Sequence, residues 1–291
     1  MIRPPGTTVA KPRLLFRPDP VLGWTLTTGY RVRVGFRKGV TQEIDADGWR
    51  KIPKSGLPSG PRIGFYGCSV TYGTGLRDTE TYTALLQAAF PDICMLNRGI
   101  GGHGTVQNYL QLRRDIAGGA VDAAVFGVLS DHRFRNIPHP ARMRQHLHRE
   151  WYELGVEQVP VIRRDTAGRA RIAYLPIWQP AIERGGFDAF LPDEWMVTDA
   201  TLAALDMVLD ETHRADLPLV FALLDTSDLQ FNAAVAARFA NCVDIALPFD
   251  AKHTHLPHDG HPNAHANTLY ARGLTPVIDR FRATLGGRGT A

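Results

Sequence analysis

The chain has 291 residues, of which 44% are hydrophobic and 21% charged, and its formal net charge is +4. This composition predicts a globular chain with a sizeable core, and it excludes a chain that is disordered over most of its length. The positive charge is nearly all arginine and lies in short pairs such as Arg113–Arg114. A nucleic-acid partner requires a basic stripe, so we expect no nucleic-acid binding.

The ends of the sequence and its cysteines give expectations about compartment and cofactors. The first residues lack an apolar signal-peptide core, and no stretch approaches the ~18 apolar residues of a membrane span. The three cysteines, Cys68, Cys94 and Cys242, lack metal-ligand spacing. We therefore expect a cytoplasmic protein with free thiols, no membrane partner, no metal and no cofactor, and the oligomeric state is left open.

The N-terminal part of the chain has its own composition. Residues 1–60 are rich in Pro, Gly and Arg, and the alternating run Tyr30–Val34 is typical of an antiparallel strand. The segment 55–61, SGLPSGP, has the composition of a linker. We expect an N-terminal β-rich extension over residues 1–60 and a main domain over residues 61–291.

From Arg62 onward, strand patterns alternate with helix patterns. The expected strands span residues 63–66, 93–96, 121–129, 217–224 and 242–246, and the expected helices span residues 79–90, 105–117, 198–215, 229–239 and 264–285. Such alternation predicts an α/β fold, with a central parallel sheet covered by helices on both faces. Ligands of these sheets bind at the carboxyl ends of the strands, so the residues after each strand are the candidate site.

An insertion at residues 133–197 interrupts the alternation. Val159–Arg164 and Arg171–Leu175 flank the turn at residues 165–168, which predicts a β-hairpin. The tryptophans of the insertion are Trp151, Trp178 and Trp195. They either line a lid or acceptor site, or anchor the insertion to the core.

The first candidate motif is Gly67-Cys68-Ser69-Val70-Thr71, directly after the first expected strand. A serine on a tight turn between strand and helix is exposed at the edge of the sheet. Its backbone N–H lies near a helix N-terminus, where it can face developing negative charge. The alternative is an ordinary helix-capping serine.

The second motif is the glycine-rich loop from Asn97 to Thr105. Its glycines resemble part of a phosphate-binding turn, but the spacing is not G-x-G-x-x-G and no acidic residue ends a strand ~20 residues on. A loop this bare is suited instead to present backbone N–H groups to an oxyanion.

The third motif is His258-Asp259-Gly260-His261-Pro262-Asn263, between the last expected strand and the last helix. His261 can take the proton of a serine, and Asp259 can fix its tautomer and stabilise its cation. The surrounding histidines His253, His255, His258 and His265 favour either a polar loop or a zinc site. No Cys or Glu motif completes a zinc site, so a serine triad is preferred over a metal.

Together with the segment Val128–Asp131 at the end of the third expected strand, these three motifs resemble the four blocks of the SGNH/GDSL hydrolases, in order. The blocks are Gly67–Thr71, Asn97–Gly102, Val128–Asp131 and Asp259–Asn263, and the resemblance covers roughly residues 62–285 without the insertion. It implies a three-layer α/β/α sandwich and a Ser–His–Asp triad of Ser69, His261 and Asp259. It also implies an oxyanion hole of the Ser69 N–H, the Gly102 N–H and a third donor at Ser130.

The sequence departs from the family pattern at three positions. Cys68 replaces the Asp of the GDS motif, which is not the catalytic acid. Ser130 replaces the Asn of the third block, and because a hydroxyl has a shorter reach than an amide, it supplies a weaker third donor or none. The commonest family spacing places the acid three residues before the His, where this chain has His258, whereas Asp259 stands two before.

The resemblance favours an ester hydrolase. No amphipathic apolar lid or long hydrophobic run flanks Ser69, so we expect it to remove a short, acetyl-like acyl group from a polar alcohol such as a carbohydrate. An acyltransferase, a hydrolase of carrier-linked thioesters and a non-catalytic binding module are the alternatives. The residues expected to bind substrate are Arg135 and Trp178. Aromatic faces suit sugar rings, and a guanidinium can hold a carboxylate or phosphate, although Arg135 can equally pair with an acid inside the insertion.

Overall fold

A computed structural model describes residues 15–53, 60–139, 151, 154–176 and 192–287. Its centre is a sheet of five strands, all paired in parallel. From one edge to the other they are β11 (Cys242–Leu247), β10 (Leu219–Asp225), β7 (Ala123–Val128), β5 (Arg62–Gly67) and β6 (Cys94–Gly99). The predicted α/β class with a parallel sheet is therefore confirmed.

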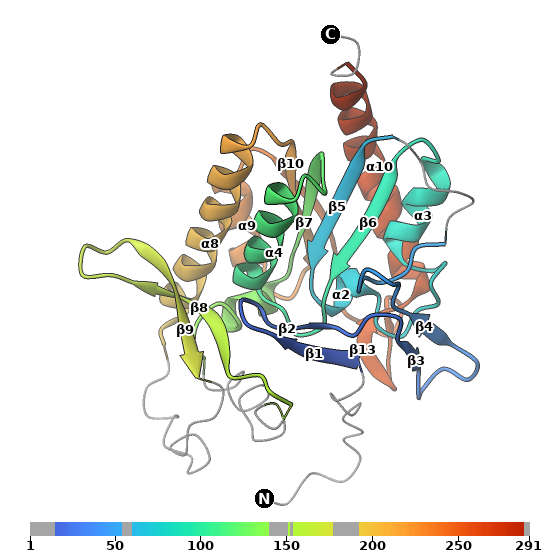
Figure 1. Ribbon diagram of the computed structural model, residues 1–291, viewed down its shortest axis with the longest axis horizontal. Coiled ribbons are helices and arrows are strands. Elements are labelled where there is room, and N and C mark those ends of the chain that lie inside the picture. The colour runs from blue at the N-terminus through green and yellow to red at the C-terminus, as the bar shows by residue number, and fades with distance from the viewer. Residues whose placement is uncertain (1–14, 54–59, 140–150, 152–153, 177–191, 288–291) are drawn as a thin grey trace, which may run out of the picture.

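Helices cover both faces of this sheet and make the three layers (Figure 1). One face packs against α3 (Tyr82–Ala89) and α10 (Ala264–Gly286), and the other against α4 (Thr105–Ala117), α8 (Glu194–Arg214) and α9 (Leu229–Arg238). Successive strand residues point to opposite faces, so both layers receive apolar side chains from the same strands.

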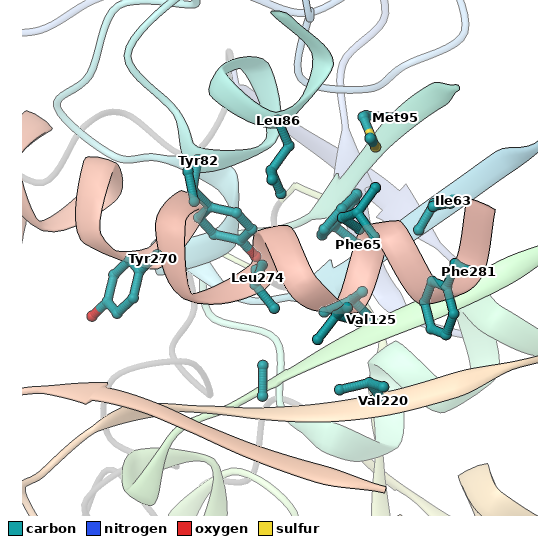
Figure 2. Close-up of a cluster of buried hydrophobic side chains, with 14 of the residues drawn as sticks. Ile63, Phe65, Tyr82, Leu86, Met95, Val125, Val220, Tyr270, Leu274 and Phe281 are labelled. Carbon is teal, nitrogen blue, oxygen red and sulfur yellow. The ribbon is translucent and has the colours of Figure 1, made fainter. Parts of the chain in front are cut away.

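Residues of β5 and β7 illustrate the two cores. Phe65 and Val125 belong to the α3–α10 side, where Figure 2 shows Leu274 of α10 beside them. Tyr66 and Phe126 belong to the opposite core, with their rings stacked at 5.5 Å. Every residue of β7 is buried, as expected for a strand covered on both faces.

Capping residues set the helix boundaries more sharply than periodicity does. The helix expected over residues 79–90 begins at Tyr82, because the Thr81 side chain accepts a hydrogen bond from the Ala84 N–H and stops the helix there. The side chains of Asp228 and Asn263 cap α9 and α10 in the same way. The helix expected over residues 105–117 is found with those bounds.

The described part of the chain also forms four antiparallel hairpins outside the central sheet. They are β1 (Phe16–Asp19) with β2 (Gly23–Leu26), β3 (Arg31–Arg33) with β4 (Thr41–Glu43), β8 (Gln158–Arg164) with β9 (Ala170–Pro176), and β12 (Thr254–His255) with β13 (Asp259–Pro262). The strand expected at Tyr30–Val34 and the hairpin expected in the insertion are both present. Two short helical turns, α2 (Ser69–Tyr72) and η1 (Ser130–Phe134), follow β5 and β7.

The N-terminal strands lie across the carboxyl ends of β5 and β6, as Figure 1 shows. This is the edge of the sheet at which the candidate motifs are expected. The expected linker at residues 55–61 lies mostly outside the described residues, so the boundary at residue 60 stays a prediction. Within the described part of the chain, no helix combines the length and the hydropathy needed to cross a bilayer.

Candidate active site

Ser69 begins the single turn of α2 directly after the central strand β5. The turn closes at Gly73, whose φ of 82° lies in the left-handed region and whose N–H donates to the carbonyls of Ser69 and Val70. The Asn97 side chain of β6 donates to the Thr71 carbonyl over 2.8 Å and so ties the turn to the neighbouring strand. Ser69 is half-buried, whereas Cys68 and Val70 on either side of it are buried. Because these neighbours are packed in the core, they fix the backbone at Ser69 and so set its position.

Cys68 is buried, with 1% of its surface exposed. Its Sγ lies 3.8 Å from the Ser69 Oγ, which donates a hydrogen bond to it. The side chain belongs to the hydrophobic core between the sheet and α10, which also includes Tyr82, Leu129 and Tyr270. The interior position leaves Ser69 as the more accessible nucleophile of the two.

His261 and Asp259 form a close pair on β13. The His261 Nδ1 lies 2.6 Å from the Asp259 Oδ1, which also accepts the backbone N–H of His261 over 2.8 Å. Burial works to raise the pKa of Asp259, but the hydrogen bond from His261 and its charge outweigh burial and hold the pKa below its usual value. β13 contacts α2, so the pair and Ser69 share one edge of the sheet (Figure 1).

His258 takes no part in this pair. It is exposed, and its backbone N–H donates to the His255 carbonyl over 3.0 Å. His255 is the histidine that lies next to the pair, opposite Asp259 in the β12–β13 register, with its ring 5.3 Å from that of Phe36. Burial and the charge of Arg37 lower the pKa of His255. The structure thus brings Asp259 to His261, while the roles of both remain predictions.

The glycine-rich loop after β6 is hydrogen-bonded to the hairpin of β1 and β2, which is called the N-terminal hairpin below. Gly102 has a φ of 82°, which favours glycine, and the Trp24 indole Nε1 donates to the Gly101 carbonyl over 3.0 Å. The His103 Nε2 lies 3.0 Å from the Trp24 carbonyl. His103 is fully buried, and burial lowers its pKa to about 3, so the ring is neutral and Nε2 carries the hydrogen donated to that carbonyl.

Ser130 makes a buried two-point contact with Asp225 at the end of β10. Its N–H donates to Oδ1 over 2.9 Å and its hydroxyl to Oδ2 over 2.5 Å. A serine hydroxyl has one hydrogen, so this bond competes with any donation to an oxyanion. Asp225 is not among the residues predicted from the sequence, although it directly follows the strand expected at 217–224, where ligands of a parallel sheet bind.

Arg135 is nearly buried, with 11% of its side chain exposed. Its Nη2 lies 2.5 Å from an Asp131 carboxylate oxygen and its Nη1 donates to the His103 carbonyl over 2.8 Å. Burial opposes the charge of Arg135, but Cys68 and Asp131 outweigh burial and raise its pKa. The acid that pairs with Arg135 is Asp131, which stands two residues before the insertion, whereas the expected partner was an acid inside it. Substrate binding by Arg135 stays a prediction.

The tryptophans of the insertion occupy different environments. Trp151 is buried, and its ring lies 4.9 Å from that of Trp24, so it anchors the insertion to the N-terminal hairpin. Trp195 is 65% exposed. Trp178, the other residue expected to bind substrate, lies outside the described residues.

The histidines near the C-terminus are engaged with the protein. His253 pairs with Asp250, and its ring stacks on that of His265. Across residues 15–53, 60–139, 151, 154–176 and 192–287, no group of three or more His, Cys, Asp and Glu side chains is arranged to hold a metal ion.

No protein-family model matches the sequence, and no curated protein matches it. Among solved structures, the chain is similar to a catalytic mutant of Axe2, an acetylxylan esterase from Geobacillus stearothermophilus, at 15% identity and a TM-score of 0.44 over 76% of this chain and 95% of that one. It is also similar to the psychrotrophic esterase EstA from Pseudoalteromonas sp., at 11% identity and a TM-score of 0.42 over 76% and 98% of the two chains. A lipolytic protein of the G-D-S-L family from Veillonella parvula has 13% identity and a TM-score of 0.42 over 75% and 98%.

These solved structures are described as GDSL lipolytic proteins and esterases, the family that the four sequence blocks resemble. At this level of similarity they carry no argument about activity. The fold is established by the strand order and the two helical layers of the chain itself.

Proposed function

We propose that this protein is a serine ester hydrolase of the SGNH/GDSL type, with Ser69 as nucleophile, His261 as general base and Asp259 as the acid that orients it. The observation that carries the proposal is the Asp259–His261 pair on β13, which contacts the turn that begins at Ser69. Serine, imidazole and carboxylate at one edge of a parallel sheet are the parts that acyl transfer through a covalent intermediate requires.

The reaction follows from where the protons lie. His261 donates its Nδ1 hydrogen to Asp259, so the neutral ring has its lone pair on Nε2. Nε2 takes the hydroxyl proton as the Ser69 Oγ attacks the ester carbonyl carbon. The tetrahedral intermediate then expels the alcohol, which receives that proton from His261. Water attacks the acyl-enzyme with the same base, releasing the acid and restoring Ser69.

The negative charge of the intermediate falls on the former carbonyl oxygen. The proposed donors to it are the backbone N–H groups of Ser69 and Gly102. Ser130 is not among these proposed donors, because its hydroxyl hydrogen is donated to the Asp225 carboxylate.

The proposed substrate is a short-acyl ester of a polar alcohol such as a carbohydrate. The apolar side chains that follow Ser69, namely Val70, Tyr72 and Leu76, are all buried in the protein. They are therefore occupied in packing, and do not offer a surface along which a long acyl chain could lie. This supports an acetyl-like group over a fatty acyl chain.

Labelling with a fluorophosphonate tests the nucleophile. Wild type should be labelled on Ser69, as peptide mass spectrometry will show, and Ser69→Ala should lose both labelling and turnover. Cys68→Ala is the matched control, since it removes the neighbouring nucleophile and should keep labelling at Ser69. Label on Cys68, or full activity in Ser69→Ala, would refute the mechanism.

A panel of aryl esters from acetyl to dodecanoyl, run beside acetylated sugars, tests the substrate. The rate should fall steeply as the acyl chain lengthens. A preference for the longest chain would refute the short-acyl proposal. Transfer to an added alcohol that outruns hydrolysis would identify an acyltransferase instead.

A further inference from the structure

The geometry points to Trp24 as a positioning residue that fixes the direction of the Gly102 N–H, and thereby builds the oxyanion hole from outside the α/β domain. This inference rests on the proposed function. Trp24 belongs to β2 of the N-terminal hairpin and lies 77 positions before Gly101 in the sequence, yet its indole Nε1 donates to the Gly101 carbonyl over 3.0 Å.

The Gly101 carbonyl and the Gly102 N–H belong to one peptide plane. This peptide is trans, so its C=O and N–H point in opposite directions. An indole that holds the carbonyl oxygen on one side therefore also fixes the direction in which the N–H points on the other side. The same bond polarises the amide and makes its N–H a stronger donor.

The loop needs such support because it is built from glycine. Gly101 and Gly102 are adjacent, and Gly102 adopts a φ of 82°. A peptide between two glycines can rotate more freely than any other. Within the loop, it is restrained by the turn in which the His103 N–H donates to the Ile100 carbonyl over 3.2 Å. The Trp24 bond adds a direct restraint on the carbonyl of this peptide, together with the Phe16 ring, which lies 3.3 Å from where a Gly101 Cβ would stand.

Trp24 itself is held on several sides. It is 2% exposed, and its ring lies 4.9 Å from that of Trp151 and 5.4 Å from that of His103. The neutral His103 donates from Nε2 to the Trp24 carbonyl, so strand and loop exchange hydrogen bonds in both directions. The position of the indole is thus set by the surrounding rings. Its bond to the Gly101 carbonyl acts together with the bond from the Arg135 Nη1 to the His103 carbonyl, which holds the loop from another side.

The test compares Trp24→Phe with Trp49→Phe. The first variant keeps an aromatic ring and loses the N–H donor to Gly101. The second makes the same change in the same N-terminal segment, at a ring that packs against the Arg98 guanidinium at 4.1 Å. We expect Trp24→Phe to lower kcat about 10- to 100-fold, with KM nearly unchanged, because the donor is misdirected only where charge develops. Trp49→Phe should leave kcat near wild type.

A second readout does not depend on activity. Protein labelled with glycine carrying ¹³C at the carbonyl and ¹⁵N gives HNCO signals only from Gly–Gly peptides. These are Gly101–Gly102, Gly118–Gly119, Gly185–Gly186 and Gly286–Gly287. Alanine variants at the first glycine of each other pair assign the Gly101–Gly102 signal by elimination. Trp24→Phe should move that signal and leave the others in place, and Trp49→Phe should move none of them.

The outcomes separate this inference from the proposed function. An unmoved Gly101–Gly102 signal, or a moved signal with kcat unchanged in an active enzyme, overturns the role of Trp24. Equal loss of kcat in both variants also overturns it, because that result indicates general destabilisation. If the wild-type protein has no esterase activity, the proposed function is refuted. The shift of the Gly101–Gly102 signal then decides by itself whether Trp24 orients this peptide.

Discussion

Two His–Asp pairs lie close together in the C-terminal part of the chain, and only one of them is assigned to catalysis. In the first, the His253 Nδ1 lies 2.8 Å from the Asp250 Oδ1, which also accepts the backbone N–H of His253 over 3.0 Å. In the second, the corresponding distances between His261 and Asp259 are 2.6 Å and 2.8 Å. The local chemistry of the two pairs is therefore nearly the same.

Their surroundings differ. The His253 side chain is 10% exposed and stacks on His265, whereas the His261 side chain is 33% exposed on a strand that contacts the Ser69 turn. The Asp250–His253 pair even has the acid three residues before the histidine, the spacing commonest in the family. A hydrogen-bonded carboxylate makes a histidine basic and oriented, but the position relative to a nucleophile decides whether that basicity is used.

Replacing the two histidines should give the largest contrast. His261→Ala should lower kcat on an aryl acetate by about 10⁴- to 10⁶-fold, because Ser69 loses its base. His253→Ala should leave kcat near wild type. Steady-state kinetics on both variants, with far-UV circular dichroism to show that each is folded, checks the prediction. A comparable loss in the two variants would erase the distinction.

Replacing the carboxylates of the two pairs should give the same contrast as replacing the histidines, with a smaller loss of kcat. Asp259→Asn should lower kcat by up to about 10⁴-fold, because the amide cannot stabilise the imidazolium formed in the transition state. Asp250→Asn and His258→Ala should change kcat little. If His258→Ala proved more damaging than Asp259→Asn in the same assay, the assignment of the acid would be wrong.

The two serines that follow β5 and β7 differ in the same way, since one is half-buried on a turn that contacts β13 and the other is buried on Asp225. Ser130→Ala should keep kcat within about tenfold of wild type, well short of the 10²- to 10³-fold loss of a removed oxyanion donor. It should lower the free energy of unfolding by about 1–3 kcal/mol, because a buried carboxylate oxygen loses its donor. Urea denaturation and kinetics together check this, and a 10³-fold rate loss with unchanged stability would restore Ser130 as a donor.

The smallest effect concerns acid stability, in which the two pairs should behave alike. The pKa values of Asp259 and Asp250 are both below the usual 3.8, so each carboxylate stabilises the fold above that pH, and its contribution is lost as the pH falls through the lowered value. For the partly exposed Asp259 this amounts to less than about 1 kcal/mol. Asp259→Asn and Asp250→Asn should each make unfolding less dependent on pH below about 4. A change in only one of them, followed by fluorescence, would show that the pairs differ in stability as well as in activity.

Much of the fold follows from local patterns in the sequence. Apolar runs and helical spacing after Arg62 predicted all five strands of the sheet and the helices that cover it, with boundaries a few residues off where a cap such as Thr81 intervenes. The motifs that follow the first and the last expected strand predicted Ser69 as the nucleophile and Asp259 and His261 as its partners. These features are local, because a strand, a turn or a pair two residues apart is specified within its own segment.

The tertiary structure decided which polar groups support one another. Trp24 and Gly101 are 77 positions apart in the sequence, and Ser130 and Asp225 are 95 positions apart. Neither contact can be predicted from local patterns. Both pairs meet only after parallel strands and the N-terminal hairpin have been brought to one edge of the sheet, and no spacing rule encodes such a meeting. The sequence by itself determined the sheet, its helices and the candidate nucleophile with its His–Asp pair. Only the packed fold decided that Ser130 is bound to a carboxylate and that Trp24 of the β1–β2 hairpin is bonded to the loop after β6, because hydrogen bonds between distant segments depend on where the chain places them.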